Sequence, residues 1–169
     1  MESVLVLTGS MGTGKTTTMA EASDLLTARN VRHAAVDLDA LAVAHTGADH
    51  DLMLRNLASV CANFEASGIT RLLIAAAVES RDELARLQCA TNARTVVVCR
   101  LRAPMAIMED RVAARERGIF ATRYIERVRV LEAILDAAGV EDFSVMTDVP
   151  VTLVATDVLR RSRWIDSLG

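Results

Sequence analysis

The sequence predicts an α/β domain in which helices cover both faces of a parallel sheet. Two observations favour this fold class. Short runs rich in β-branched residues alternate along the chain with longer segments of helical pattern. Several of these runs, such as Val96–Cys99, are apolar at every position, which is typical of strands buried on both faces. The connections between segments are short and fit a doubly wound arrangement.

Five segments are predicted as strands because they are short, apolar and rich in Val, Ile and Leu. In chain order they are Ser3–Leu7, Arg32–Asp37, Arg71–Ala76, Thr95–Leu101 and Phe143–Met146. Ligands in folds of this kind bind at the carboxyl ends of the strands. The residues that follow each strand are therefore the first candidates for a functional site.

Six segments are predicted as helices. They are Lys15–Arg29, Asp51–Ser67, Arg81–Ala90, Pro104–Arg117, Thr122–Ala138 and Val151–Arg161. In the second, apolar residues recur at steps of three and four, and Gly68 follows as a stop signal. Pro104 suits the first turn of the fourth helix, where its missing N–H costs nothing, and Gly118 follows that helix. Thr122 is a capping-type residue at the start of the fifth.

Length and composition limit the classes of protein. The 169 residues, 51% of them hydrophobic, are expected to form one globular domain over residues 1–169. Charged residues interrupt every apolar stretch before the roughly 20 residues that a membrane span needs, and no signal-peptide pattern opens the chain. We therefore expect a cytoplasmic protein with no membrane partner. The three cysteines have no disulfide or zinc spacing and are expected to be buried thiols.

A glycine-rich loop follows the first predicted strand and precedes the first predicted helix. It fills the P-loop pattern G-x-x-x-x-G-K-[ST] with Gly9, Ser10, Met11, Gly12, Thr13, Gly14, Lys15 and Thr16. Backbone amides of such a loop bind the phosphates of ATP or GTP, and the helix that follows adds its positive dipole end. Lys15 then reaches the β- and γ-phosphates, the Thr16 hydroxyl coordinates Mg²⁺, and Thr17 bonds the α-phosphate. Lys15 is also the only lysine in the chain.

Two carboxylates, Asp37 and Asp39, follow the second predicted strand. Phosphoryl transfer to an alcohol needs positioning, charge neutralisation and a carboxylate near the attacking hydroxyl. Asp37 is the candidate for accepting the hydroxyl proton or holding Mg²⁺, and Asp39 for bonding the acceptor substrate. The alternative is an exposed acidic loop of the kind that often follows a strand.

With these residues the chain resembles the small P-loop kinases that phosphorylate metabolites, including shikimate kinase, gluconate kinase, adenylylsulfate kinase and chloramphenicol phosphotransferase. The resemblance runs from Val4 to about Trp164, although only the P-loop is a tight motif. It implies a P-loop NTPase three-layer sandwich with a five-stranded parallel sheet in the order 2-3-1-4-5. It also implies ATP and Mg²⁺ as cofactors and a small helical lid, at about residues 111–123.

Three arginines crowd the end of the fourth predicted helix, namely Arg111, Arg115 and Arg117. In the similar kinases, arginines at this place close over ATP and neutralise the phosphoryl group in transfer, and Arg111 is the candidate for stacking on the adenine. The resemblance thus assigns Arg111 and Arg115 to catalysis. The alternative is a solvated helix face on which neighbouring acids pair with the arginines.

The third strand end departs from the wider P-loop pattern, because small residues, Ala75–Ala77, precede its first acid, Glu79. These alanines leave room for a substrate that Glu79 or Arg81 would contact. The alternative is an ordinary helix N-terminus, where Glu79 and Asp82 favour the dipole.

The leading functional prediction is an ATP-dependent kinase for a hydroxyl group of a small metabolite or antibiotic. A kinase for nucleic-acid 5′-hydroxyls is a second class, but the net charge of −3 and the few aromatic residues argue against a nucleic-acid partner. A nucleotide-responsive ATPase or binding module is a third class. The guanine-specificity motif N-K-x-D is excluded, since no lysine lies outside the P-loop. The sequence leaves the acceptor, the preference for ATP or GTP and the oligomeric state open.

Overall fold

The structure is a computed structural model that describes residues 1–42, 49–115 and 119–166. Its centre is a five-stranded parallel sheet in the order β2-β3-β1-β4-β5, as predicted. The strands are β1 (Ser3–Thr8), β2 (Ala34–Asp37), β3 (Arg71–Ala75), β4 (Thr95–Arg102) and β5 (Phe143–Met146). Their carboxyl ends lie together at one edge of the sheet, where the predicted site residues begin.

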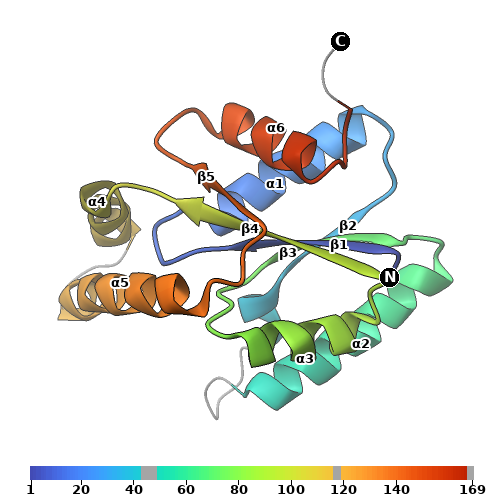
Figure 1. Ribbon diagram of the computed structural model, residues 1–169, viewed down its shortest axis with the longest axis horizontal. Helices are drawn as coiled ribbons and strands as arrows, with labels where there is room; N and C mark the ends of the chain where they lie inside the picture. The colour runs from blue at the N-terminus through green and yellow to red at the C-terminus, as the bar shows by residue number, and fades with distance from the viewer. Residues whose placement is uncertain (43–48, 116–118, 167–169) are drawn as a thin grey trace.

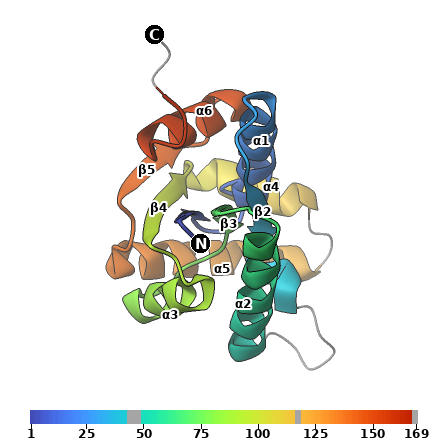
Figure 2. The ribbon, with the colours of Figure 1, turned by 90° about the vertical axis from the view of Figure 1, so that its right-hand side faces the viewer.

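Helices cover both faces of the sheet and give three layers (Figures 1 and 2). On one face lie α1 (Lys15–Ala28) and α6 (Val151–Arg161), and on the other lie α2 (His50–Ala66), α3 (Arg81–Thr91) and α5 (Ile119–Ala138). The remaining helix, α4 (Met105–Arg115), lies beyond the carboxyl ends of the strands beside α5. A 3₁₀ turn, η1 (Leu38–Ala42), follows β2.

The alternation of side chains along the central strand divides the core into two clusters. Leu5 and Leu7 of β1 pack with residues of α1 and α6, whereas Val4 and Val6 pack with residues of α2 and α3. All four are fully buried. Both faces of β1 are therefore apolar, which is why its sequence reads as a continuous hydrophobic run. Trp164 is buried in the cluster of α1 and α6.

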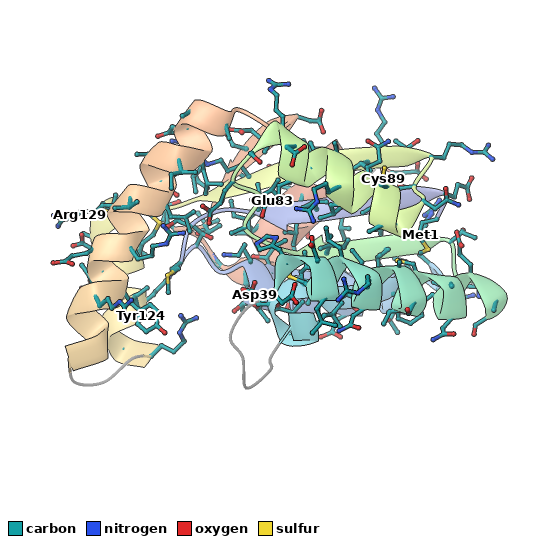
Figure 3. The ribbon with its side chains drawn as sticks, turned by 90° about the horizontal axis from the view of Figure 1, so that it is seen from below. Met1, Asp39, Glu83, Cys89, Tyr124 and Arg129 are labelled. Atoms are coloured by element: carbon teal, nitrogen blue, oxygen red, sulfur yellow. The ribbon has the colours of Figure 1, made fainter. Side chains whose placement is uncertain are left out.

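The element boundaries coincide with the predicted ones or lie within two residues of them, except at the start of the fifth helix. The predicted strand Arg32–Asp37 begins only at Ala34, where pairing with β3 starts. The fifth helix begins at Ile119, so Thr122 lies inside it instead of capping it. The expectation of three buried thiols is wrong for Cys89, which lies on the exposed side of α3, whereas Cys61 and Cys99 are buried (Figure 3).

Within residues 1–42, 49–115 and 119–166, every helix is too short or too polar to cross a bilayer.

Candidate functional site

The glycine loop between β1 and α1 has a backbone that only glycine adopts readily. Gly9, Gly12 and Gly14 have φ angles of 148°, 80° and 85°. A Cβ on Gly9 would lie 2.6 Å from the carbonyl oxygen of Leu101, and one on Gly12 would lie 2.6 Å from that of Met108. The loop is therefore held closely between the end of β4 and the backbone of α4.

Hydroxyl groups fix the shape of this loop. The Thr13 hydroxyl donates to the carbonyl of Ser10 at 2.8 Å, and the buried Ser10 hydroxyl donates to the carbonyl of Val128 on α5 at 3.1 Å. Gly14, which precedes α1, has no side chain with which to cap the first turn of that helix. Amide groups at such a helix start are suited to binding an anion.

Lys15 closes the loop into a ring. Its Nζ donates to the carbonyl oxygens of Gly9 and Ser10, at 2.9 and 3.2 Å. Burial lowers the pKa of Lys15 below the ordinary value of 10.5, although the carboxylates of Asp39 and Asp37 act in the opposite sense.

The first turn of α1 and the end of β2 meet at Thr16 and Asp37. The Thr16 hydroxyl donates to Oδ2 of Asp37 at 2.6 Å, while Oδ1 of Asp37 accepts from the backbone N–H of Asp39 at 3.3 Å. These bonds orient the Asp37 carboxylate. A hydroxyl and a carboxylate side by side are oxygen ligands of the kind that Mg²⁺ takes, so this pair fits the predicted metal.

A cavity of about 470 Å³ joins these groups at the carboxyl edge of the sheet. Lys15, Thr16 and Thr17 line it from α1, and Asp37 and Asp39 line it from the end of β2. In Figure 3, Asp39 and Met1 lie toward opposite ends of the sheet. Another cavity, of about 560 Å³, surrounds Met1 and lies away from the glycine loop.

Helices α4 and α5 and the end of β3 complete the wall. Arg111, Val112 and Arg115 line the cavity from α4, with Ala77 after β3 and Leu131 on α5. Ala77 belongs to the small-residue run expected to leave room for a substrate. Val112 and Leu131 were not predicted as site residues, because the sequence does not show which side of a helix will face the cavity.

Arg111 joins two loops across this wall. Its Nη1 donates to the carbonyl of Gly12 at 3.1 Å and to Oγ1 of Thr147 at 3.2 Å, and its Nη2 donates to the carbonyl of Thr147 at 2.7 Å. Thr147 follows β5, so Arg111 links the phosphate loop to the loop between β5 and α6. Of the other predicted lid arginines, Arg115 lines the same cavity. Arg117 lies outside the described residues.

Glu79 and Arg81 lie outside the set of residues that line this cavity. Oε1 of Glu79 accepts from Nη2 of Arg127 on α5 at 3.0 Å, and the Arg81 guanidinium donates to the carbonyl of Gly139 at 3.0 Å. The Arg127 contact joins the loop after β3 to α5. It was missed in the sequence because the partners are far apart along the chain and neither belongs to a motif.

Comparison with models of known protein families gives no match, and comparison with curated protein sequences finds no relative. Solved structures do match. A sugar kinase from a Janibacter species is 17% identical, with a TM-score of 0.67 over 94% of this chain and 92% of that one. Shikimate kinase from Acinetobacter baumannii, in complex with shikimate, is 19% identical, with a TM-score of 0.63 over 95% of this chain and 92% of that one.

A third similar structure is the APS kinase of Mycobacterium tuberculosis in complex with AMPPNP and APS. It is 15% identical, with a TM-score of 0.65 over 94% of this chain and 95% of that one. At such identities the likeness concerns the path of the backbone and its topology. The chain therefore has the fold of the small P-loop kinases.

Proposed function

We propose that this protein is an ATP-dependent phosphotransferase that moves the γ-phosphoryl group to a hydroxyl of a small molecule. The observation that carries the proposal is the contact between Thr16 and Asp37, which brings a carboxylate to the phosphate loop inside one cavity. Solved structures of the same fold support it, since one was determined with shikimate and another with AMPPNP and APS.

The phosphate side of the site is formed by the loop and by the start of α1. Its amide groups and Lys15 bind the phosphates, and Lys15 exchanges its bonds to the carbonyls of Gly9 and Ser10 for phosphate oxygens. Thr16 and Asp37 are the residues that would hold Mg²⁺. When bound, this ion neutralises charge on the phosphates.

The acceptor side is formed by the residues after β2 and β3. Asp37 accepts the proton of the attacking hydroxyl, because its carboxylate is already oriented by Thr16 and by the amide of Asp39. Asp39 bonds the acceptor, and Ala77 leaves space for it. Glu79, which is bonded to Arg127, and Arg81 do not line the cavity, and we propose that one of them contacts the acceptor beyond it.

The arginines of α4 neutralise the phosphoryl group during transfer. Arg111 and Arg115 line the same cavity as Asp37, and a guanidinium binds phosphate oxygens in a bidentate manner. Arg111 also contacts Thr147 in the loop between β5 and α6, and we propose that it is the arginine that stacks on the adenine. Arg117 acts with them in the proposed lid.

A screen of acceptors tests this proposal. ATP consumption is measured with sugars, shikimate-like acids, hydroxylated antibiotics and an oligonucleotide with a free 5′-hydroxyl, and ³¹P NMR identifies any phosphate ester. The Lys15→Met variant, which lacks the phosphate-binding ammonium, is the control for contaminating enzymes. A small hydroxylated compound should stimulate consumption in the natural chain alone. Stimulation only by the oligonucleotide, or slow hydrolysis that no acceptor changes, would replace the proposal with one of the two alternative functions.

A further inference from the structure

The most buried charge in the structure belongs to Arg100, on β4. Its side chain is only 1% exposed, although it lies in a strand that runs through the core. In the sheet it pairs with Thr8, the last residue of β1 before the glycine loop. A guanidinium at this place is costly to bury, so its partners define what it does.

These partners belong to α5 and to the residues that follow it. Nη2 of Arg100 donates to Oε2 of Glu132 at 3.0 Å, and Nη1 donates to Oδ1 of Asp136 at 2.8 Å. Nη1 also lies 3.5 Å from Oε1 of Glu141. One arginine of the sheet therefore holds two successive turns of α5 and the residue that leads into β5.

This network is not the arrangement that would stabilise the fold most. Nε of Arg100, Oε1 of Glu132 and Oε2 of Glu141 are buried with no hydrogen-bond partner among the described residues. Buried ion pairs with such unmet groups are often no more stabilising than apolar side chains of similar volume. The network instead fixes the orientation of α5 relative to β4, because a guanidinium and a carboxylate pair in a defined geometry.

The same part of α5 contacts the phosphate loop. The carbonyl of Val128, one turn before Glu132, accepts the hydrogen bond from the Ser10 hydroxyl. Leu131, the neighbour of Glu132, lines the cavity. The Glu132 carboxylate is also among the charges that raise the pKa of Lys15, against the larger effect of burial.

We propose that Arg100 is a positioning residue for the phosphate site. By holding Glu132 against β4, it fixes the place of α5 over the glycine loop, and thereby the hydrogen bond from Ser10 and the wall at Leu131. Its role in turnover rests on the phosphotransferase function proposed above. Its role in ordering the loop does not, and can be measured without turnover.

The test uses the double variant Arg100→Met/Glu132→Met, which removes the two most buried charges of the network and keeps similar side-chain volumes. Asp136 and Glu141, the more exposed partners of Arg100, keep their charges. A single Arg100→Met change would leave Glu132 buried without its partner and would confuse positioning with stability. The matched control is Arg102→Met, on the same strand, because Arg102 pairs with the exposed Asp136 but not with Glu132. Three quantities are measured, namely the thermal midpoint, amide hydrogen exchange of residues 9–14, and kcat and KM.

The double variant should unfold at a temperature close to that of the natural chain. Hydrogen exchange in residues 9–14 should become faster, because α5 no longer holds Ser10 in one place. We expect kcat to fall about 10- to 100-fold, the range for a small misplacement of reacting groups, while KM for ATP changes much less. Arg102→Met should leave both the exchange rates and kcat near those of the natural chain.

The proposal would be overturned if a folded double variant exchanged the amides of residues 9–14 as slowly as the natural chain, or kept the kcat of the natural chain. The network would then have only a structural role. If the double variant does not fold, Arg100→Lys decides, since lysine keeps the charge but has a single nitrogen in place of the two, Nη1 and Nη2, that reach Asp136 and Glu132 separately. That variant should show the same faster exchange, and unchanged exchange would overturn the proposal. If the natural chain shows no turnover with any acceptor, the proposed function fails, but the exchange measurement still decides the role of Arg100.

Discussion

The hydroxyl of Thr16 donates a 2.6 Å hydrogen bond to the carboxylate of Asp37, and this bond ties the first turn of α1 to the end of β2. The two residues are 21 positions apart in the chain. Their contact places the group expected at the phosphates beside the group expected at the acceptor.

Replacing Asp37 with Asn should separate binding from transfer. The amide keeps the size of the side chain and an oxygen for Thr16, but it cannot take the proton of a hydroxyl. We expect transfer to slow by about 10²- to 10⁴-fold, the usual contribution of a general base, with ATP affinity changed far less. Calorimetric titration with ATP and a coupled kinase assay measure the two effects. Asp24→Asn, at an exposed position of α1, is the control, and unchanged turnover in Asp37→Asn would refute the role of the base.

Replacing Gly12 with Ala should abolish nucleotide binding. The new Cβ would lie 2.6 Å from the carbonyl oxygen of Met108, so either the loop or α4 must move. Gly139→Ala is the matched control, because Gly139 also has a positive φ, of 50°, but its Cβ would meet no atom within 4 Å. The control should cost only about 1–2 kcal/mol of stability, from backbone conformation alone. Thermal unfolding with and without ATP measures the stability and the ATP binding of both variants. Normal ATP binding by Gly12→Ala would contradict the prediction and would show that α4 moves aside at little cost.

Replacing Arg111 with Ala should weaken nucleotide binding, since the side chain holds Gly12 and Thr147 together. We expect a loss of about 10-fold in ATP affinity, corresponding to roughly 1.4 kcal/mol. Arg111→Lys should recover little of it, because an ammonium cannot contact both loops as a guanidinium does. The control is Arg129→Ala, which removes an exposed pair with Glu109 on the neighbouring helices. Equal affinities for Arg111→Ala and Arg129→Ala would contradict this prediction.

The buried thiols should lower stability in alkaline solution. Burial raises the pKa of Cys99 to about 12 and that of Cys61 to about 11, against the value of 9.0 for a free thiol. Between pH 9 and 11 the unfolded chain therefore loses protons that the folded chain keeps, and stability falls as pH rises. The slope from each thiol approaches about 1.4 kcal/mol per pH unit.

Urea unfolding at several pH values measures this slope, and Cys99→Ala should show a shallower one than the natural chain. A thiol reagent supplies an independent check. In the folded protein it should modify Cys89 quickly, and Cys61 and Cys99 only after unfolding. Rapid modification of all three thiols in the folded chain would contradict the burial of Cys61 and Cys99.

Much of the fold could be predicted because its signals are local. Runs such as Val4–Leu7 and Val96–Cys99 are apolar at every position, and this follows from being covered on both faces. The strand order came from a resemblance carried by the P-loop and by the acid after the second strand. Asp37 could be predicted to lie near the phosphate loop, because the carboxyl ends of parallel strands lie at the same edge of the sheet.

The contacts that could not be predicted join residues far apart in the sequence. Arg100 stands between Cys99 and Leu101 in a strand expected to be apolar, which is a visible anomaly, but its partner Glu132 lies 32 positions later. Glu79 and Arg127 are likewise separated by 48 positions. Cys89 was wrongly predicted to be buried, because packing decides which side of α3 faces solvent, and the apolar residues beside Cys89 do not show it.

The ring that Lys15 closes has a consequence for nucleotide binding. The ammonium of Lys15 joins the carbonyls of Gly9 and Ser10, so hydrogen bonds within the protein fix the curvature of the loop. Under the proposed function, a nucleotide would meet a loop that is already curved, and the entropic cost of ordering that loop on binding would be smaller. In that case the only lysine of the chain would exchange these two carbonyls for phosphate oxygens.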